Sequence, residues 1–253
     1  MTNEPKQTDQ ANNDAKLDES ESGYGSFHRR VLEGRGGLFA VMTTIAILIG
    51  GMVEILPMYT AGAGPETADW VTPYTPLEVA GRDIYIREGC YLCHSQWIRP
   101  MRAEVLRYGE WSRAPEYQYD RPFQLGSRRM GPDLHRVGGK YPDAWHYEHM
   151  RDPRSTSTGS VMPPYPWLLE ATIDAGDVQA SVEALMKSGV PYTQVEVGGV
   201  PESVAEQGQG IVTSLGQAGI ETTADKEIVA LIAYLQRLGR EGKEYLASQG
   251  GGE

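Results

Sequence analysis

The sequence predicts a mainly α-helical protein, with a single N-terminal transmembrane helix followed by a helical domain that has long ordered loops. Three observations predict this fold class. Residues 38–58 form one long apolar run, and residues 77–89 and 224–242 show helical periodicity. No segment shows the alternation of apolar and polar residues that is typical of a half-buried strand.

Composition sets limits on the function. The 253 residues are 40% hydrophobic and 23% charged, which is sufficient for a packed core. The formal net charge of -11 argues against nucleic-acid binding, because that binding depends on cationic contacts to phosphates. Two cysteines cannot form a disulfide framework. They could form one disulfide, one redox pair, half of a metal site or one haem attachment.

Residues 1–28 are predicted to be a disordered cytoplasmic tail, because they begin with a polar, acidic stretch without apolar periodicity. Residues 29–59 are predicted to be the transmembrane anchor. The run at 38–58 carries one charge, Glu54, and as a helix it covers roughly 30 Å, the thickness of the bilayer core. Gly50, Gly51 and Glu54 are either a small-residue dip near the headgroups or a face that packs on other membrane helices.

Three arginines precede this run, and no Lys or Arg follows it until Arg82. The positive-inside rule therefore places the N-terminus in the cytoplasm and most of the chain outside. A cleaved signal peptide is the alternative, and Ala61-Gly62-Ala63 resembles a cleavage site. The apolar run is longer than the h-region of about 7–15 residues that signal peptides have, which favours a retained anchor.

The rest of the chain divides into three parts. Residues 60–76 are rich in Pro, Gly and Thr and are predicted to be a linker. Residues 77–240 are predicted to be the folded domain, with helices at both ends and shorter ones near 143–152 and 174–188. The helix at the C-terminal end of this domain has an apolar stripe and ends at Gly239. Residues 241–253 are predicted to be a flexible C-terminal tail.

The chemistry is concentrated in Cys90-Tyr91-Leu92-Cys93-His94, the C-x-x-C-H pattern of c-type haem attachment. Two thiols three residues apart can each add to one haem vinyl group, and His94 then lies under the ring as an iron ligand. A thioredoxin-like redox pair requires a βαβ context, and none is apparent. A zinc site that adds His146 and His149 has x₂ spacing between the histidines instead of x₃₋₅. A structural disulfide across two residues would be short and strained.

A haem that only moves electrons needs a second axial ligand, and a methionine sulfur is a soft ligand that raises the reduction potential. The candidates after the motif are Met101, Met130, Met150, Met162 and Met186. Met162 is preferred, because the prolines that follow it in VMPPYPWL stiffen the loop. With His94 and Met162 both bound to iron, no open coordination site remains for oxygen.

Two further features surround the motif. The carbonyl of Pro132, in GPDL, could accept a hydrogen bond from the other ring nitrogen of His94 and orient the imidazole. Residues 95–129 form a long insertion rich in Arg, Trp and Tyr. Its arginines, with Arg99 and Arg129 as examples, either make ordinary surface pairs or bind haem propionates and a partner subunit.

Together these residues resemble the monohaem subunit (subunit II) of cbb(3)-type cytochrome c oxidases. The resemblance is carried by GGMVEILPM, GRDIYIREGCYLCHSQWIRPMRAEVLRYGEWS, YDRPFQLGSRRMGPDLHRVGGKYPDAWHYEHMRDPRS, VMPPYPWL and ALIAYLQRLG. It covers about residues 30–170 and the last long helix. Trp97 and Arg121 depart from the family pattern, and both lie in the insertion rather than among the proposed ligands.

The resemblance implies a class I-like cytochrome c fold, with the first and last helices of the domain crossing at Gly81 and Tyr85. It implies one covalently attached haem c, with Cys90 and Cys93 as attachment points and His94 and Met162 as axial ligands. The family relays electrons from an upstream cytochrome c donor toward a haem–copper catalytic subunit, beside a second cytochrome c subunit. It is not catalytic alone and lies in the bacterial inner membrane, with the haem domain in the periplasm.

Two alternatives to this function stay open. One is the haem c subunit of a nitric oxide reductase, which shares the plan of one anchor and one haem. The long 95–129 insertion and VMPPYPWL argue against it. The other is a membrane-tethered zinc or thiol-redox module that uses Cys90, Cys93, His146 and His149.

Overall fold

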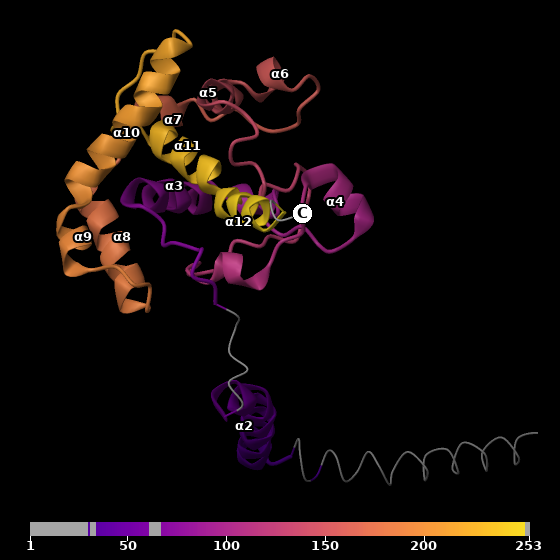
Figure 1. Cartoon of the computed structure of the whole chain (residues 1–253). Helices are drawn as coiled ribbons and strands as arrows, with labels where there is room; N and C mark the ends of the chain where they lie inside the picture. Colours follow the sequence, from indigo (N-terminus) through magenta and orange to yellow (C-terminus); the bar gives the residue numbers. More distant parts are fainter. Residues whose placement is uncertain (1–29, 31–33, 61–66, 251–253) are drawn as a thin grey trace, which may run out of the picture. The chain divides into compact units, whose positions relative to one another are not determined.

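A computed structural model of the chain describes residue 30, residues 34–60 and residues 67–250. The predicted tail at 1–28 lies outside these residues. The chain divides into two compact units, Met1–Gly64 and Pro65–Glu253. The described residues are mainly helical, as predicted, and their only β pairing is an isolated bridge between Thr172 and Lys226. Figure 1 shows this arrangement of helices.

The first unit contains helix α2, Gly36–Thr60. Its segment Gly36–Pro57 has a mean hydropathy of 2.1 and is long and apolar enough to cross a membrane. Leu48, Ile49 and Val53 are each more than 60% exposed, although an apolar helix in water would bury such side chains. This pattern is expected of a helix whose surroundings are lipid.

The second unit is organised around two helices that pack on each other, α3 (Pro76–Arg87) and α11 (Glu227–Arg237). Glu78 in the first turn of α3 accepts a hydrogen bond from the Thr75 N–H at 2.8 Å, which satisfies one free donor at the helix start. A Cβ on Gly81 would lie 2.0 Å from the Ala230 carbonyl oxygen, so only glycine allows this approach. The Tyr85 and Tyr234 rings meet beside it, with centroids 5.4 Å apart.

The predicted stripe on α11 is buried, but the remaining sides of the helix are buried too. Val229, Ala230 and Tyr234 are all fully enclosed. Helices α5 (Asp143–Arg151), α7 (Trp167–Glu170) and α10 (Val200–Gln217) contact α11 in addition to α3. The sequence pattern indicates a one-sided helix, whereas α11 is the central element of the domain.

Several further helices complete the second unit. Helices α5 and α8 (Ala175–Lys187) match the two short helices predicted near 143–152 and 174–188. Helix α6 spans Pro153–Thr156. Helices α9 (Gln194–Gly198) and α10 were not predicted. Helix α10 packs closely at Gly208, where an added Cβ would lie 2.8 Å from the Cβ of Ala224.

The ends of the second unit differ from the prediction of a linker and a flexible tail. Helix α12 spans Arg240–Gly250. Its Glu241 accepts a hydrogen bond from the Thr72 N–H at 3.0 Å and pairs with Arg237 at 2.8 Å. The Tyr245 ring stacks on Trp70 with centroids 4.6 Å apart. The described residues before α3 and after α11 therefore pack together through a hydrogen bond and a ring stack.

Candidate haem site

Cys90 begins the short 3-10 helix η2, Cys90–Leu92, which lies shortly after α3, and Cys93 caps its C-terminal end. Gly89 has φ +70, a left-handed conformation that favours glycine and turns the chain out of α3. The Cys93 and His94 N–H groups both donate to the Cys90 carbonyl, at 3.1 and 2.9 Å. Both thiols are free and partly buried, so one compact turn presents them together.

The His94 ring is held in one orientation. Its Nδ1 donates to the Pro132 carbonyl oxygen at 2.8 Å, since a carbonyl can only accept. Nε2 is then the nitrogen with a free lone pair. Burial lowers the pKa of His94, while the Pro132 hydrogen bond and the charge of Asp133 oppose this. A neutral imidazole is the form that binds a metal.

Gly131 is the reason that the loop can come so close to this ring. Its N–H donates to the Cys93 carbonyl at 3.0 Å. A Cβ at this position would lie 2.2 Å from His94 Cε1 and 2.7 Å from Nδ1. The GPDL segment therefore requires glycine at its first position for steric reasons, and the proline carbonyl follows at the position that reaches Nδ1.

Asp133 anchors this loop to the segment after the cysteines, a role that sequence reasoning missed. Its Oδ2 accepts from the Ser95 hydroxyl at 2.6 Å and from the Trp97 N–H at 2.8 Å, and its Oδ1 accepts from the His135 N–H at 2.8 Å. Three hydrogen-bond donors hold this buried carboxylate in one position, and with it the loop that carries Pro132. Its place between the proline and the following leucine could have suggested a turn, but not these partners.

One cavity of about 530 Å³ joins the predicted residues. Its size falls within the range of cofactor pockets, about 300–1,000 Å³. Cys90, Cys93, His94, Pro132 and Met162 all line it. Its other walls include Tyr85, Leu231 and Leu235 from the α3–α11 core, Tyr141, Trp145 and Met150 from the α5 region, and Tyr165 after Met162.

The cavity narrows the choice of a second axial ligand. Met101 and Met186 are not among the residues that line it, whereas Met130, Met150 and Met162 are. Met130 is 66% exposed, and Met150 is a core residue at 8%. Met162 is partly buried against the core, and its N–H donates to the Ser160 hydroxyl at 3.2 Å. Its loop position leaves the thioether less committed to core packing than that of Met150.

The residues present fit a bound haem. Tyr85 and His146 line the cavity, and the Tyr85 hydroxyl and His146 Nε2 are buried without a hydrogen-bond partner among the described residues. Both atoms are available to bond to a ligand in the cavity, which would relieve the cost of about 1–3 kcal/mol that an unsatisfied buried polar group carries. Burial also raises the pKa of Cys90 to about 12, whereas catalytic thiols have a lowered pKa. This environment disfavours thiol–disulfide exchange, because exchange proceeds through a thiolate.

The zinc alternative finds no support in the described part of the chain. His146 and His149 do line the same cavity as the cysteines. However, no group of three or more His, Cys, Asp or Glu side chains is arranged there to hold a metal ion. His149 Nδ1 is also engaged, at 2.5 Å from the Thr156 hydroxyl.

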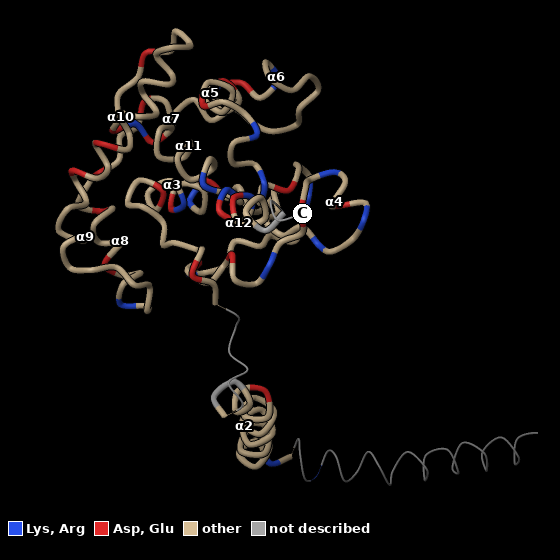
Figure 2. The backbone as a smooth tube through the Cα atoms, in the orientation of Figure 1, with Lys and Arg blue, Asp and Glu red and all other residues tan. Residues whose placement is uncertain are grey.

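The arginine-rich insertion, residues 95–129, contains helix α4 (Arg102–Tyr108) and the 3-10 helix η3 (Ala114–Tyr117). Figure 2 shows basic residues on and around α4. Arg129 pairs with Glu104 at 2.8 Å, and Arg99 also pairs with Glu104. Both arginines named in the sequence analysis therefore have a carboxylate partner within the insertion, which favours ordinary charge pairing for these two.

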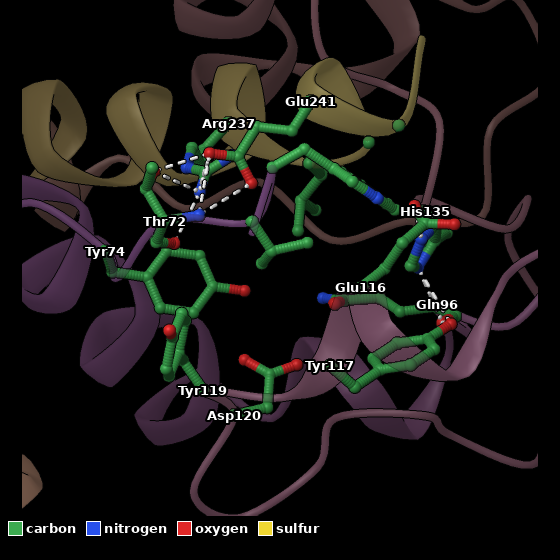
Figure 3. Close-up of a pocket in the computed structure, with 15 residues that line it drawn as sticks. Thr72, Tyr74, Gln96, Glu116, Tyr117, Tyr119, Asp120, His135, Arg237 and Glu241 are labelled. Carbon is green, nitrogen blue, oxygen red and sulfur yellow. Dashed lines mark hydrogen bonds and ion pairs between the residues drawn. The ribbon is translucent and has the colours of Figure 1, made fainter. Parts of the chain in front are cut away.

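A second, smaller cavity of about 40 Å³ lies where the insertion meets the core. Figure 3 shows Tyr74, Glu116 and Asp120 around it, with Arg237, Thr72 and Glu241 bonded at its edge. The Tyr117 hydroxyl beside it donates to the Gln96 carbonyl at 2.6 Å. Gln96 follows His94 by two residues, so this polar cluster supports the loop that carries the imidazole.

A helical domain with a free C-x-x-C-H turn on a large cavity, in which the histidine of the turn is held by a hydrogen bond, is typical of c-type cytochromes. Helix α2 is long and apolar enough to cross a membrane. The chain matches the family model described as "Cytochrome C oxidase, mono-heme subunit/FixO" over residues 29–241, and it belongs to this family. A search of curated proteins found no match. The family assignment makes the protein a monohaem cytochrome c subunit of a cytochrome c oxidase complex.

Proposed function

We propose that the protein carries one haem c, bound through Cys90 and Cys93 and ligated by His94 and Met162, and passes electrons toward the haem–copper catalytic subunit of a cbb(3)-type oxidase. The observation that carries the proposal is the convergence of these four side chains on one cavity. They come from two segments about 70 residues apart, and a single ligand bound in this cavity could contact all four of them.

Attachment requires no oxidant. Cys90 and Cys93 would hold the haem through two thioether bonds, because each thiol would add across a vinyl group with its hydrogen going to the other vinyl carbon, and nothing would leave. Both cysteines are free, as the reaction requires. The bound haem supplies a one-electron couple. The chain's own residues fix the imidazole through Pro132, exclude water with the α3–α11 core and offer the Met162 thioether.

This arrangement supports relay rather than catalysis. His94 and Met162 would both bind the iron and would leave it no open position, so oxygen reduction would belong to the haem–copper subunit. The remaining partners in the proposal are a second cytochrome c subunit of the same complex and an upstream cytochrome c donor. The arginines before α2 support the remaining part of the proposal, that the N-terminus is cytoplasmic and the haem domain lies on the periplasmic side of the bacterial inner membrane.

The haem part of the proposal is tested with the full chain, produced in a host competent for cytochrome c maturation. Haem should remain on the chain after denaturation, and its reduced complex with pyridine should absorb at about 550 nm. Replacing both Cys90 and Cys93 with Ala should abolish this. A colourless wild-type chain, or haem that dissociates on denaturation, would overturn the proposal.

The relay is tested in the purified native complex. Flash mixing of the reduced complex with oxygen should oxidise this haem after the catalytic subunit and before the external donor. A complex that carries Cys90→Ala and Cys93→Ala should lose donor-driven oxygen consumption while its catalytic subunit still reacts with chemical reductants. Unchanged donor-driven turnover would show that electrons bypass this subunit.

A further inference from the structure

Three Arg or Lys side chains line the 530 Å³ cavity, and one of them already has a carboxylate partner. Arg136 pairs with Glu116 and donates to the backbone carbonyls of Glu110 and Trp111, both at 3.1 Å. Its charge is neutralised within the insertion. It therefore supports the cavity wall and does not add a free cation to it.

Arg107 and Lys140 also line the cavity, and neither has an ion pair within the described residues. Each instead lies over the ring of its neighbour. The Arg107 guanidinium carbon is 5.1 Å from the Tyr108 centroid, and Lys140 Nζ is 5.5 Å from the Tyr141 centroid. Such contacts position a cation without neutralising it. Two positive charges without a carboxylate partner in the described structure therefore line the same cavity, one from each end of the segment 107–140.

His146 adds a buried polar atom to the same wall. It is 2% exposed, and its Nε2 has no hydrogen-bond partner in the described structure. The rings of Trp145 and Tyr141 meet it edge to face, with centroids 5.4 and 6.2 Å away. Burial lowers the pKa of His146 to about 4, so the imidazole is neutral near pH 7 and offers one N–H donor.

Among the peripheral groups of a haem, only the two propionate carboxylates combine with cations and N–H donors. The two free cations match the two carboxylates in number and are opposite in charge, and the neutral imidazole adds one hydrogen-bond donor. We propose that Arg107, Lys140 and His146 form the binding site for the haem propionates. This inference rests on the proposed haem, and it replaces Arg99 and Arg129 as candidates because those two are bound to Glu104.

The site has a measurable electrostatic consequence. Reduction adds an electron to the haem, so a nearby uncompensated cation favours the reduced form. Removing Arg107 or Lys140 should therefore lower the reduction potential. A cation of the same type that does not line the cavity should have little effect, because solvent and salt screen its charge from the haem.

The test is an equilibrium redox titration of the haem-loaded full chain in detergent. Arg107→Gln is compared with Arg102→Gln, which changes another exposed arginine of α4 that does not line the cavity. Lys140→Gln is compared with Lys187→Gln, at an exposed position on α8. The two cavity variants should shift the reduction equilibrium about three- to tenfold toward the oxidised form, where tenfold corresponds to about 59 mV for one electron. The controls should shift it less than about twofold.

A structure of the native complex tests His146 directly and does not depend on variants that fold. A propionate oxygen should lie about 2.7–3.2 Å from His146 Nε2, with Arg107 and Lys140 in ion-pair contact. Propionates that face Arg99 or Arg129, or cavity variants that match their controls, would overturn the inference and leave the haem intact. A chain without haem would instead overturn the proposed function.

Discussion

Gly131→Ala gives the sharpest test of the proximal side of the site. The added methyl group would lie 2.2 Å from His94 Cε1, and an ordinary contact begins at 3.4 Å. The ring would have to recede by roughly 1 Å to relieve the overlap. It is held by the 2.8 Å hydrogen bond to Pro132, the residue next to the substitution, so it cannot recede without losing that bond.

The cost follows from these two contacts. Overpacking a rigid site costs about 1–3 kcal/mol, and loss of a hydrogen bond costs about 0.5–1.5 kcal/mol. We expect Gly131→Ala to reduce the unfolding free energy of the haem-loaded chain by about 2–4 kcal/mol. Displacement of the imidazole should also weaken its bond to iron, so the variant should bind carbon monoxide where the wild type does not.

The assay is denaturant unfolding of the full chain in detergent, followed through haem absorbance, with a carbon monoxide titration of the reduced protein. Gly210→Ala is the control. This glycine lies inside α10 with nothing within 4 Å of an added Cβ, so the same substitution should stabilise by about 0.5–1 kcal/mol. A Gly131→Ala variant within about 0.5 kcal/mol of wild type, with an unchanged spectrum, would refute the steric argument.

Three further outcomes are expected. Met162→Ala should lower the reduction potential and open the iron to carbon monoxide, whereas Met101→Ala, away from the cavity, should do neither; equal behaviour of the two would remove Met162 as ligand. Gly81→Ala should force α3 away from α11 and lower the melting temperature by about 6–12 °C, a cost of about 3 kcal/mol, and an unchanged transition would contradict the close packing. Burial raises the pKa of Glu116, but hydrogen bonds from His135 and Arg136 outweigh this and hold the pKa at about 2, below its ordinary 4.5. Stability from this group should be complete above pH 4.5 and disappear as the pH falls toward 2, so acid unfolding of Glu116→Gln should be flatter in that window.

The local sequence predicted the haem attachment turn and the helices with strong periodicity. The residues of the C-x-x-C-H pattern lie within one turn. The contact between His94 Nδ1 and the Pro132 carbonyl could be anticipated because proline has a carbonyl but no N–H, and GPDL holds it at a fixed point in a turn. The apolar run at 38–58 depends only on hydropathy and length, and α2 follows from them. These features are local, so composition and spacing are sufficient to describe them.

Long-range partners were beyond the reach of the sequence. The pattern of α11 indicated one apolar face, and the burial of its other sides depends on contacts with α5, α7 and α10, of which α10 lies in a stretch without a strong pattern. The sequence after Gly239 predicts a polar tail, whereas Glu241 accepts a hydrogen bond from the N–H of Thr72, about 170 residues earlier in the chain.

By itself, the sequence determined the family, the apolar helix that is long enough to cross a membrane, and the helical class, and it predicted the haem attachment turn, because each depends on residues that are close together in the chain. The tertiary structure decided which charges remain free at the cavity. Arg99 and Arg129 pair with Glu104, whereas Arg107 and Lys140 have no carboxylate partner in the described structure. Spacing cannot distinguish these arginines, because charge pairing depends on distances in space that only the folded backbone sets.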